Sequence, residues 1–380
     1  MTPLARQIAN RLRHARGWST PEKLLVLNVD DYGNVRLATR QARDALAARI
    51  EGFGGYMDRV DALETREDLE ALFDVLTAVR DKRGRPAVMT AYALCANPDF
   101  ARIRADRRYV CEPLPATFTR RAAEQPKDYN GAWALWQEGM EQGILRPQFH
   151  GREHLNVALI EAKLAQGDPD LEVNLQMESM AGLRGLAEMP GVGFTHAFGG
   201  DDPKHIEDQL HILRDGIERF EKVFGFRSLT FTPPAQKLLP GLAGALRPAG
   251  ILTLDRPFVE RRTRGLRRRI PRLNFPTPPR ATRPGTIVRT VSFEPCQGTY
   301  SDPVGHAMGQ IDLAFRSGKP AVVSSHRVNF AGHIEPGNRR DGLRALKELL
   351  ERIVATWPEV RFVSADELAG EMQQRGTITP

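Results

Sequence analysis

The stretch Leu24–Gly33, LLVLNVDDYG, decides how the rest of the chain is interpreted. Its apolar part, Leu24 to Leu27, predicts a buried strand, which leads into two adjacent acids, Asp30 and Asp31, and a Tyr-Gly turn. α/β barrels and open α/β sheets keep their chemistry at the carboxyl ends of their strands. Successive strand side chains point to opposite faces, so the two acids cannot share one task unless the chain twists there. The pair is therefore either functional or a local device that caps a helix or shapes a turn.

Alternation of strand and helix patterns predicts the fold class. Eight short runs are predicted to be core strands: Leu24–Leu27, Ala87–Thr90, Pro147–His150, Val192–His196, Leu229–Thr232, Ile251–Leu254, Ala321–Ser325 and Val360–Val363. Amphipathic helical patterns such as Lys204–Phe224 lie between them, and this alternation is typical of a parallel sheet. Seven or eight strands favour a (β/α) barrel. The first strand is not followed by GxGxxG, which argues against a dinucleotide site.

The domain prediction is a basic N-terminal segment over residues 1–20 and a single barrel domain over 21–380, with an Arg/Pro-rich insertion near 256–285. The 380 residues are 41% hydrophobic and 27% charged, which is ordinary for a globular enzyme. No apolar run approaches the roughly 18 residues that span a bilayer. Three cysteines, Cys95, Cys111 and Cys296, match no zinc or redox spacing, so we expect a reduced, cytoplasmic setting.

The net charge of +7 is concentrated in one run, Arg261–Arg272, which contains seven arginines. Such a run attracts anions, so an anionic polymer, a lipid-linked phosphate or a membrane surface is the expected partner. The run contains no aromatic residue that would stack on bases, and we therefore expect no nucleic acid. A cytoplasmic protein with peripheral membrane attachment is compatible with this pattern.

Two histidines, His150 and His154, stand four residues apart just after a strand candidate, in HGREHLN. If this segment enters a helical turn, both rings project from one face, at about the spacing that a single metal ion needs. A carboxylate from the first strand would complete a set of two histidines and one acid with open positions for water and substrate. We expect one divalent metal, Zn²⁺ first, with Fe, Co or Mn as alternatives. A pair of surface histidines is the other interpretation.

The remaining acid of the first strand is then free to take a proton from the water as general base. His326 ends the strand candidate AVVSSH and is the candidate general acid for the leaving group. A structural or substrate-binding histidine is the alternative there. In a barrel the carboxyl ends of the strands share one face, so residues far apart in sequence can converge.

NVDDYG, HGREH and SSHRVNF, in this order and each at a strand end, resemble motifs of the polysaccharide deacetylases, the NodB-homology carbohydrate esterases. The resemblance runs roughly from Leu24 to Leu368 and points to a divergent bacterial branch. It implies a distorted (β/α) barrel and metal-dependent removal of an acetyl group from an acetylated saccharide. It also implies roles for five residues: Asp30 as base, His326 as acid, and Asp31, His150 and His154 as metal ligands.

The chain departs from the family pattern in the spacing between Asp31 and His150, which is longer than usual, and in the residue that tethers the base. The family has an arginine in an RxPxG-like motif that tethers the base, but the matching region here is FTPPAQ. Arg227 and Arg327 are the candidate substitutes. Asp255 is a candidate for the acid that orients the catalytic histidine. Four residues are proposed to bind substrate: Asn97, Asp255, Glu294 and Arg327.

Three alternatives remain open from the sequence. A chitooligosaccharide deacetylase, with its similar NADDFG-like strand end, would perform the same chemistry on a shorter substrate. A barrel glycosidase would use Asp30 with a second carboxylate such as Asp255 or Glu294, because two acids must flank the scissile bond. A non-catalytic barrel that binds a glycan or a membrane would be consistent with the missing arginine.

Overall fold

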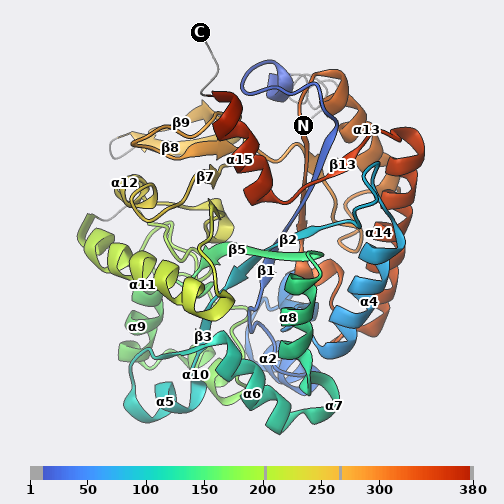
Figure 1. Ribbon diagram of the computed structural model, residues 1–380. Helices are drawn as coiled ribbons and strands as arrows, with labels where there is room; N and C mark the ends of the chain where they lie inside the picture. The colour runs from blue at the N-terminus through green and yellow to red at the C-terminus, as the bar shows by residue number, and fades with distance from the viewer. Residues whose placement is uncertain (1–11, 201–202, 265–267, 377–380) are drawn as a thin grey trace.

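The computed structural model describes residues 12–200, 203–264 and 268–376, and a parallel sheet lies at its centre (Figure 1). Within these residues the sheet has nine strands in the order β10-β7-β6-β5-β2-β1-β12-β11, with β13 paired to β1. The strands are β1 (Leu24–Tyr32), β2 (Met89–Leu94), β5 (Leu145–Gly151), β6 (Thr230–Phe231), β7 (Thr253–Asp255), β10 (Gly285–Ile287), β11 (Val291–Ser292), β12 (Ala321–His326) and β13 (Arg361–Phe362). Each pairing in the sheet is parallel.

The sheet curls until its two edges come close together. β10 and β11 are the two ends of the pairing order, yet only residues 288–290 separate them in the chain. A connection of that length reaches at most about 14 Å between the flanking Cα atoms. The predicted distorted (β/α) barrel of seven to eight core strands is thus confirmed, and the closing segment 288–290 lies at its seam.

Helices cover the outside of the sheet (Figure 1). They are α2 (Arg40–Arg49), α3 (Tyr56–Val60), α4 (Arg66–Ala78), α5 (Phe100–Asp106), α6 (Leu114–Glu124), α7 (Pro126–Tyr129), α8 (Ala132–Glu141), α9 (Val157–Gln166), α10 (Pro169–Gln176), α11 (Ile206–Phe224), α12 (Ala243–Leu246), α13 (Pro303–Arg316), α14 (Pro336–Thr356) and α15 (Ala365–Gly376). Short 3-10 turns are η1 (Pro203–His205), η2 (Pro234–Gln236), η3 (Pro240–Leu242) and η4 (Arg327–Asn329). No helix within the described ranges is long and apolar enough to cross a bilayer.

Local sequence signals account for several of these elements. Thr65 caps α4 through a reciprocal capping box with Asp68, because each side chain accepts from the other residue's backbone N–H. Residues Leu213, Phe220 and Phe224 form the buried stripe of α11. β1 lies between two parallel neighbours, β2 and β12, and its nine residues are all buried, as an apolar central strand requires.

Two local predictions are corrected. Val192–His196 is not a strand: this glycine-flanked segment forms turns, and β6 pairs directly with β5, which leaves no place for a strand between them. The insertion near 256–285 is not only a loop, because β8 (Val259–Arg264) and β9 (Arg268–Leu273) pair as an antiparallel hairpin. A second small antiparallel pair joins β3 (Ala96–Pro98) to β4 (Cys111–Pro113).

Parts of two predicted segments lie outside the described residues. Residues 1–11 of the basic N-terminal segment are among them, as is Arg267 of the arginine run. The other six arginines of the run are in the two strands of the hairpin, β8 and β9.

Close approach between α14 and η4 gives a stability test. A Cβ at Gly342 would meet the backbone oxygen of Asn329 at 1.7 Å, so helix and turn cannot keep their contact. We expect Gly342→Ala to lower the free energy of unfolding by about 1–3 kcal/mol. Gly309→Ala is the matched helical control, since nothing lies within 4 Å of its added Cβ. It should raise stability by about 0.5–1 kcal/mol. Urea unfolding of both variants measures the difference, and equal stabilities would contradict the contact.

Candidate active site

The two acids of β1 are aimed differently by a local backbone distortion. Asp31 has a φ of 73°, a left-handed conformation that is rare for a residue other than glycine. The pairing register between β1 and β2 shifts between Val29 and Tyr32, as at a β-bulge. Both acids are buried, with exposed fractions of 6% for Asp30 and 3% for Asp31. The chain therefore does twist at the pair, and each carboxylate has its own set of partners.

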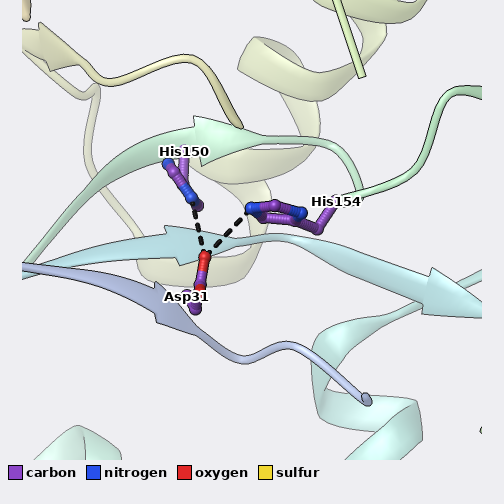
Figure 2. Close-up of side chains that lie close together, drawn as sticks. All are labelled: Asp31, His150 and His154. Atoms are coloured by element: carbon purple, nitrogen blue, oxygen red, sulfur yellow. Dashed lines mark hydrogen bonds and ion pairs between the residues drawn. The ribbon is translucent and has the colours of Figure 1, made fainter. Parts of the chain in front are cut away.

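Asp31 lies against both predicted histidines (Figure 2). Its Oδ1 is 3.2 Å from Nε2 of His150 and 3.0 Å from Nε2 of His154. His150 is on β5, whereas His154 lies in the bend before α9, so the expected helical turn between them is absent. The rings nonetheless converge, with centroids 5.1 Å apart. The two rings therefore converge as predicted, but through a strand end and a bend instead of a helical turn.

The chemistry of this group fits a divalent metal. The three residues are buried, and their ligand atoms all lie within 4.8 Å of one another. The ring Nδ1 of His150 is 2.7 Å from the Thr232 carbonyl oxygen, so Nδ1–H donates and Nε2 keeps its lone pair. Burial lowers the pKa of His154, which favours the neutral ring that metals bind. One carboxylate and two neutral imidazoles are typical of catalytic metal sites with open positions.

Asp30 is held by an arginine that the sequence analysis missed. Both Nη atoms of Arg289 donate to the carboxylate, at 2.8 Å to Oδ2 and 2.5 Å to Oδ1. Burial alone would raise the pKa of Asp30, but Arg289, with His150 and His326, outweighs it and lowers that pKa below its ordinary value. Arg289 lies in the seam segment 288–290, between β10 and β11. The sequence signal that could have revealed this arginine is its place within the strand-like run TIVRTVSF, residues 286–293.

Neither substitute proposed from the sequence tethers Asp30. Arg227 is a surface residue that pairs with Glu221. Arg327 is 1% exposed, and its guanidinium donates to Asp61, to Glu64 and to the Asn34 carbonyl. The structure thus gives Arg327 an internal bridging role between the end of β12 and the turn after β1.

Asp255 is the second partner of Arg289. The Nε of Arg289 donates to Oδ2 of Asp255, which also accepts from the Thr232 hydroxyl at 3.2 Å. Burial raises the pKa of Asp255, and Arg289 acts against that rise. Asp255 therefore anchors the arginine, and the acid that orients His326 is a different residue.

His326 is paired with Glu294. The ring Nδ1 of His326 is 2.6 Å from Oε1 of Glu294, and the Asn329 amide donates to the other carboxylate oxygen at 2.5 Å. Burial opposes the charged ring, but Glu294 outweighs it and raises the pKa of His326 to about 9. His326 and Asp30 are Cα partners on adjacent parallel strands. The protonated His326 ring therefore lies at the same carboxyl end of the sheet as the acid pair.

Asn97 supports the turn that follows β1. Its Oδ1 accepts from the Val35 N–H at 2.9 Å, and its Nδ2 donates to the Gly33 carbonyl at 2.8 Å. Like Asp255 and Arg327, it is buried and engaged in internal contacts. Of the four residues proposed to bind substrate, Glu294 alone directly contacts a candidate catalytic side chain, His326.

Comparison with known proteins finds no family model and no curated protein that matches this chain. Solved structures match at low identity. A probable polysaccharide deacetylase from Pseudomonas aeruginosa PAO1 has a TM-score of 0.48 and 10% identity, with 94% of each chain covered. The allantoinase Puue has a TM-score of 0.47 and 12% identity, covering 95% of this chain and 94% of its own.

The peptidoglycan deacetylase PdaC from Bacillus subtilis has a TM-score of 0.34 and 12% identity, covering 93% of this chain and 94% of its own. Deacetylases are the family whose motifs this sequence resembles.

Arg289 provides a test of how the base is held. Arg289→Gln leaves two buried carboxylates without a cation, which should lower the free energy of unfolding by about 3–5 kcal/mol. Because Arg289 lowers the pKa of Asp30, its loss should raise that pKa and move the acid limb of a pH–rate profile to higher pH. Arg289→Lys keeps the positive charge but loses the two-pronged contact. Its free energy of unfolding and its acid limb should therefore lie between those of the parent and Arg289→Gln.

The matched control is Arg66→Gln, which breaks the exposed pair with Glu70 at the start of α4. It should cost no more than about 1 kcal/mol and leave the pH profile unchanged. Urea unfolding measures the first effect, and the rate of the catalysed reaction as a function of pH measures the second. An Arg289→Gln variant with an unmoved acid limb would show that Arg289 does not set the charge of Asp30.

Proposed function

We propose that this protein is a metal-dependent hydrolase that removes an acetyl group from a glycan or glycan precursor. The observation that carries the proposal is the separation of tasks at one strand end. Asp31 converges with His150 and His154, whereas Asp30 is withheld from them by Arg289. A mere cap or turn would not need an acid bound to a buried cation beside an acid aimed at two imidazoles.

Asp31, His150 and His154 are the residues that would hold the metal. A divalent ion bound there would polarise the acetyl carbonyl and lower the pKa of a water molecule. Zn²⁺ suits one carboxylate and two imidazoles, and Fe, Co and Mn remain alternatives. The Thr232 carbonyl fixes the His150 ring in the orientation that this role requires.

Asp30 and His326 would supply the proton transfers. Asp30 is kept ionised by Arg289 and would accept the proton of the attacking water. His326 is kept protonated by Glu294 and would donate a proton to the leaving nitrogen or oxygen. Because their backbones are in register on β1 and β12, both groups lie at the carboxyl end of the sheet. The barrel thus holds a base and an acid in opposite charge states at neutral pH.

The two other classes of function are less well supported. A glycosidase needs two carboxyls on either side of the scissile bond, roughly 5–10 Å apart. Asp30 and Asp255 are instead bound to one guanidinium, and Glu294 is bound to His326 and Asn329. The non-catalytic barrel was suggested by the absence of a tethering arginine, and Arg289 occupies that role.

The substrate class is an acetylated saccharide, with the acetyl group on either a nitrogen or an oxygen atom. An anionic polymer or membrane surface at Arg261–Arg272 and a cytoplasmic location also belong to the proposal. In support of a reducing compartment, Cys95, Cys111 and Cys296 are free thiols in the structure.

Removal of the metal ligands tests the proposal. His150→Ala/His154→Ala should lose bound metal and release acetate at least about 100-fold more slowly, because no residue replaces the two imidazoles. His205→Ala/His211→Ala, at the start of α11, removes two histidines elsewhere and should retain both properties. Elemental analysis and acetate release from a panel of N- and O-acetylated saccharides provide the measurements. Full metal content in the first variant would refute the site.

The pKa of His326 makes a second test. A raised pKa means that the imidazolium is present at lower pH and is lost as pH rises through about 9. Acetate release should therefore fall on the alkaline side near that value. Glu294→Gln removes the group that raises the pKa, so the alkaline limb should move down by about one pH unit or more. Glu348→Gln, on the exposed face of α14, should leave the limb in place. An alkaline limb that ignores Glu294→Gln would contradict the pairing.

A further inference from the structure

A cavity of about 540 Å³ on the outer face of the sheet, next to β7, suggests a second binding site. Its walls come from α12, β7, the start of β10 and the base of the β8–β9 hairpin, which is drawn in orange beside β7 in Figure 1. Arg256, Arg272, Arg280 and Arg283 line it, and none of its lining residues, all within the described ranges, is acidic. We propose that this cavity binds a phosphate-bearing ligand.

The positive charge of the cavity is largely uncompensated. Arg256 pairs with Glu260 at 3.3 Å. For Arg272, Arg280 and Arg283, no ion pair with an acid occurs within the described ranges, and all three side chains are exposed. Four guanidinium groups around one hollow repel each other, and an anion placed among them relieves that repulsion.

The backbone holds two of these arginines ready for a ligand. The Arg280 N–H donates to the Arg283 carbonyl at 3.0 Å, which closes a tight turn. Prolines at 278, 279 and 284 flank this turn and restrict its backbone dihedrals. Ordering the turn on binding therefore costs little conformational entropy. The Arg280 carbonyl also accepts from the Nε of the Arg247 side chain at 2.9 Å, which holds the turn without using the Arg280 or Arg283 side chains.

The cavity is distinct from the candidate active site. Leu254 lines the cavity, whereas the next residue, Asp255, binds Arg289. Adjacent side chains on a strand point to opposite faces of the sheet. The hollow is therefore on the other side of β7 from the acid pair.

The chemistry of the lining favours phosphate. The planar guanidinium donates two parallel hydrogen bonds to phosphate oxygens, and several such groups around one anion are typical of phosphate recognition. The volume is within the usual range of about 300–1,000 Å³ for small-molecule sites. The phosphate can belong to a soluble molecule or to a lipid headgroup. Val259 and Leu273, register partners on the adjoining hairpin, are 46% and 45% exposed, which is the reason to test lipid as one source.

The experiment titrates inorganic pyrophosphate into the full chain by calorimetry. Arg280→Gln/Arg283→Gln should bind about tenfold more weakly or worse, because two charged donors are lost. The control Arg340→Gln/Arg344→Gln, on the exposed face of α14, removes the same two charges, from +7 to +5, and should bind within about twofold of the parent. Unchanged melting temperature and acetate release in Arg280→Gln/Arg283→Gln show that the fold and the catalytic site are intact.

A second arm separates the two sources of phosphate. Sedimentation with vesicles of phosphatidylglycerol, but not of phosphatidylcholine, that depends on Arg280 and Arg283 would assign a lipid headgroup. Pyrophosphate binding without sedimentation would assign a soluble ligand. The proposal is overturned if neither probe binds, or if the Arg280→Gln/Arg283→Gln variant and the α14 control bind the probes equally well.

Discussion

Arg289 is the cation that two buried carboxylates share, and the arrangement of the candidate site at the carboxyl ends of the strands depends on it. Asp30 is on β1 and Asp255 is on β7, four places away in the pairing order of the sheet. One guanidinium can reach both only because the sheet curls and the seam segment delivers Arg289 between them. Without Arg289, each acid would be a buried negative charge with no cation beside it, which costs several kcal/mol. The same contact therefore stabilises the curl and keeps Asp30 ionised.

A second buried network aligns the other half of this site. Arg327, directly after His326, donates to Asp61 and Glu64, and Glu64 in turn accepts from the Gly33 N–H and the Trp136 indole. The end of β12 is thereby tied to the turn that ends β1. Each network couples one strand end to β1, so Asp30, Asp31 and His326 are positioned against a common strand.

Predictions from the sequence succeeded where local pattern and chemistry coincide. The apolar run before Asp30 and each of the short strand and helix patterns are readable within a few residues. Interpretation was less successful where long-range contacts decide the outcome. Val192–His196 has the composition of a strand, yet the direct pairing of β5 with β6 excludes it from the sheet. The sequence analysis proposes Arg227 or Arg327 as the partner of Asp30, whereas the structure has Arg289, 259 residues from Asp30 along the chain.

By itself, the sequence determined the fold class and the residue types available at the strand ends, because hydrophobic periodicity and acid or histidine placement are local properties. It also determined that Asp31, His150 and His154 were candidates for one site. The resemblance already implied that Asp31, and not Asp30, faces the histidines, and the tertiary structure supplies the physical reason, which is the left-handed backbone at Asp31. The tertiary structure alone decided which arginine holds Asp30, because Arg289 reaches that acid through the closure of the barrel seam. It also decided which acid orients His326, because Glu294 follows β11 and β11 pairs with β12.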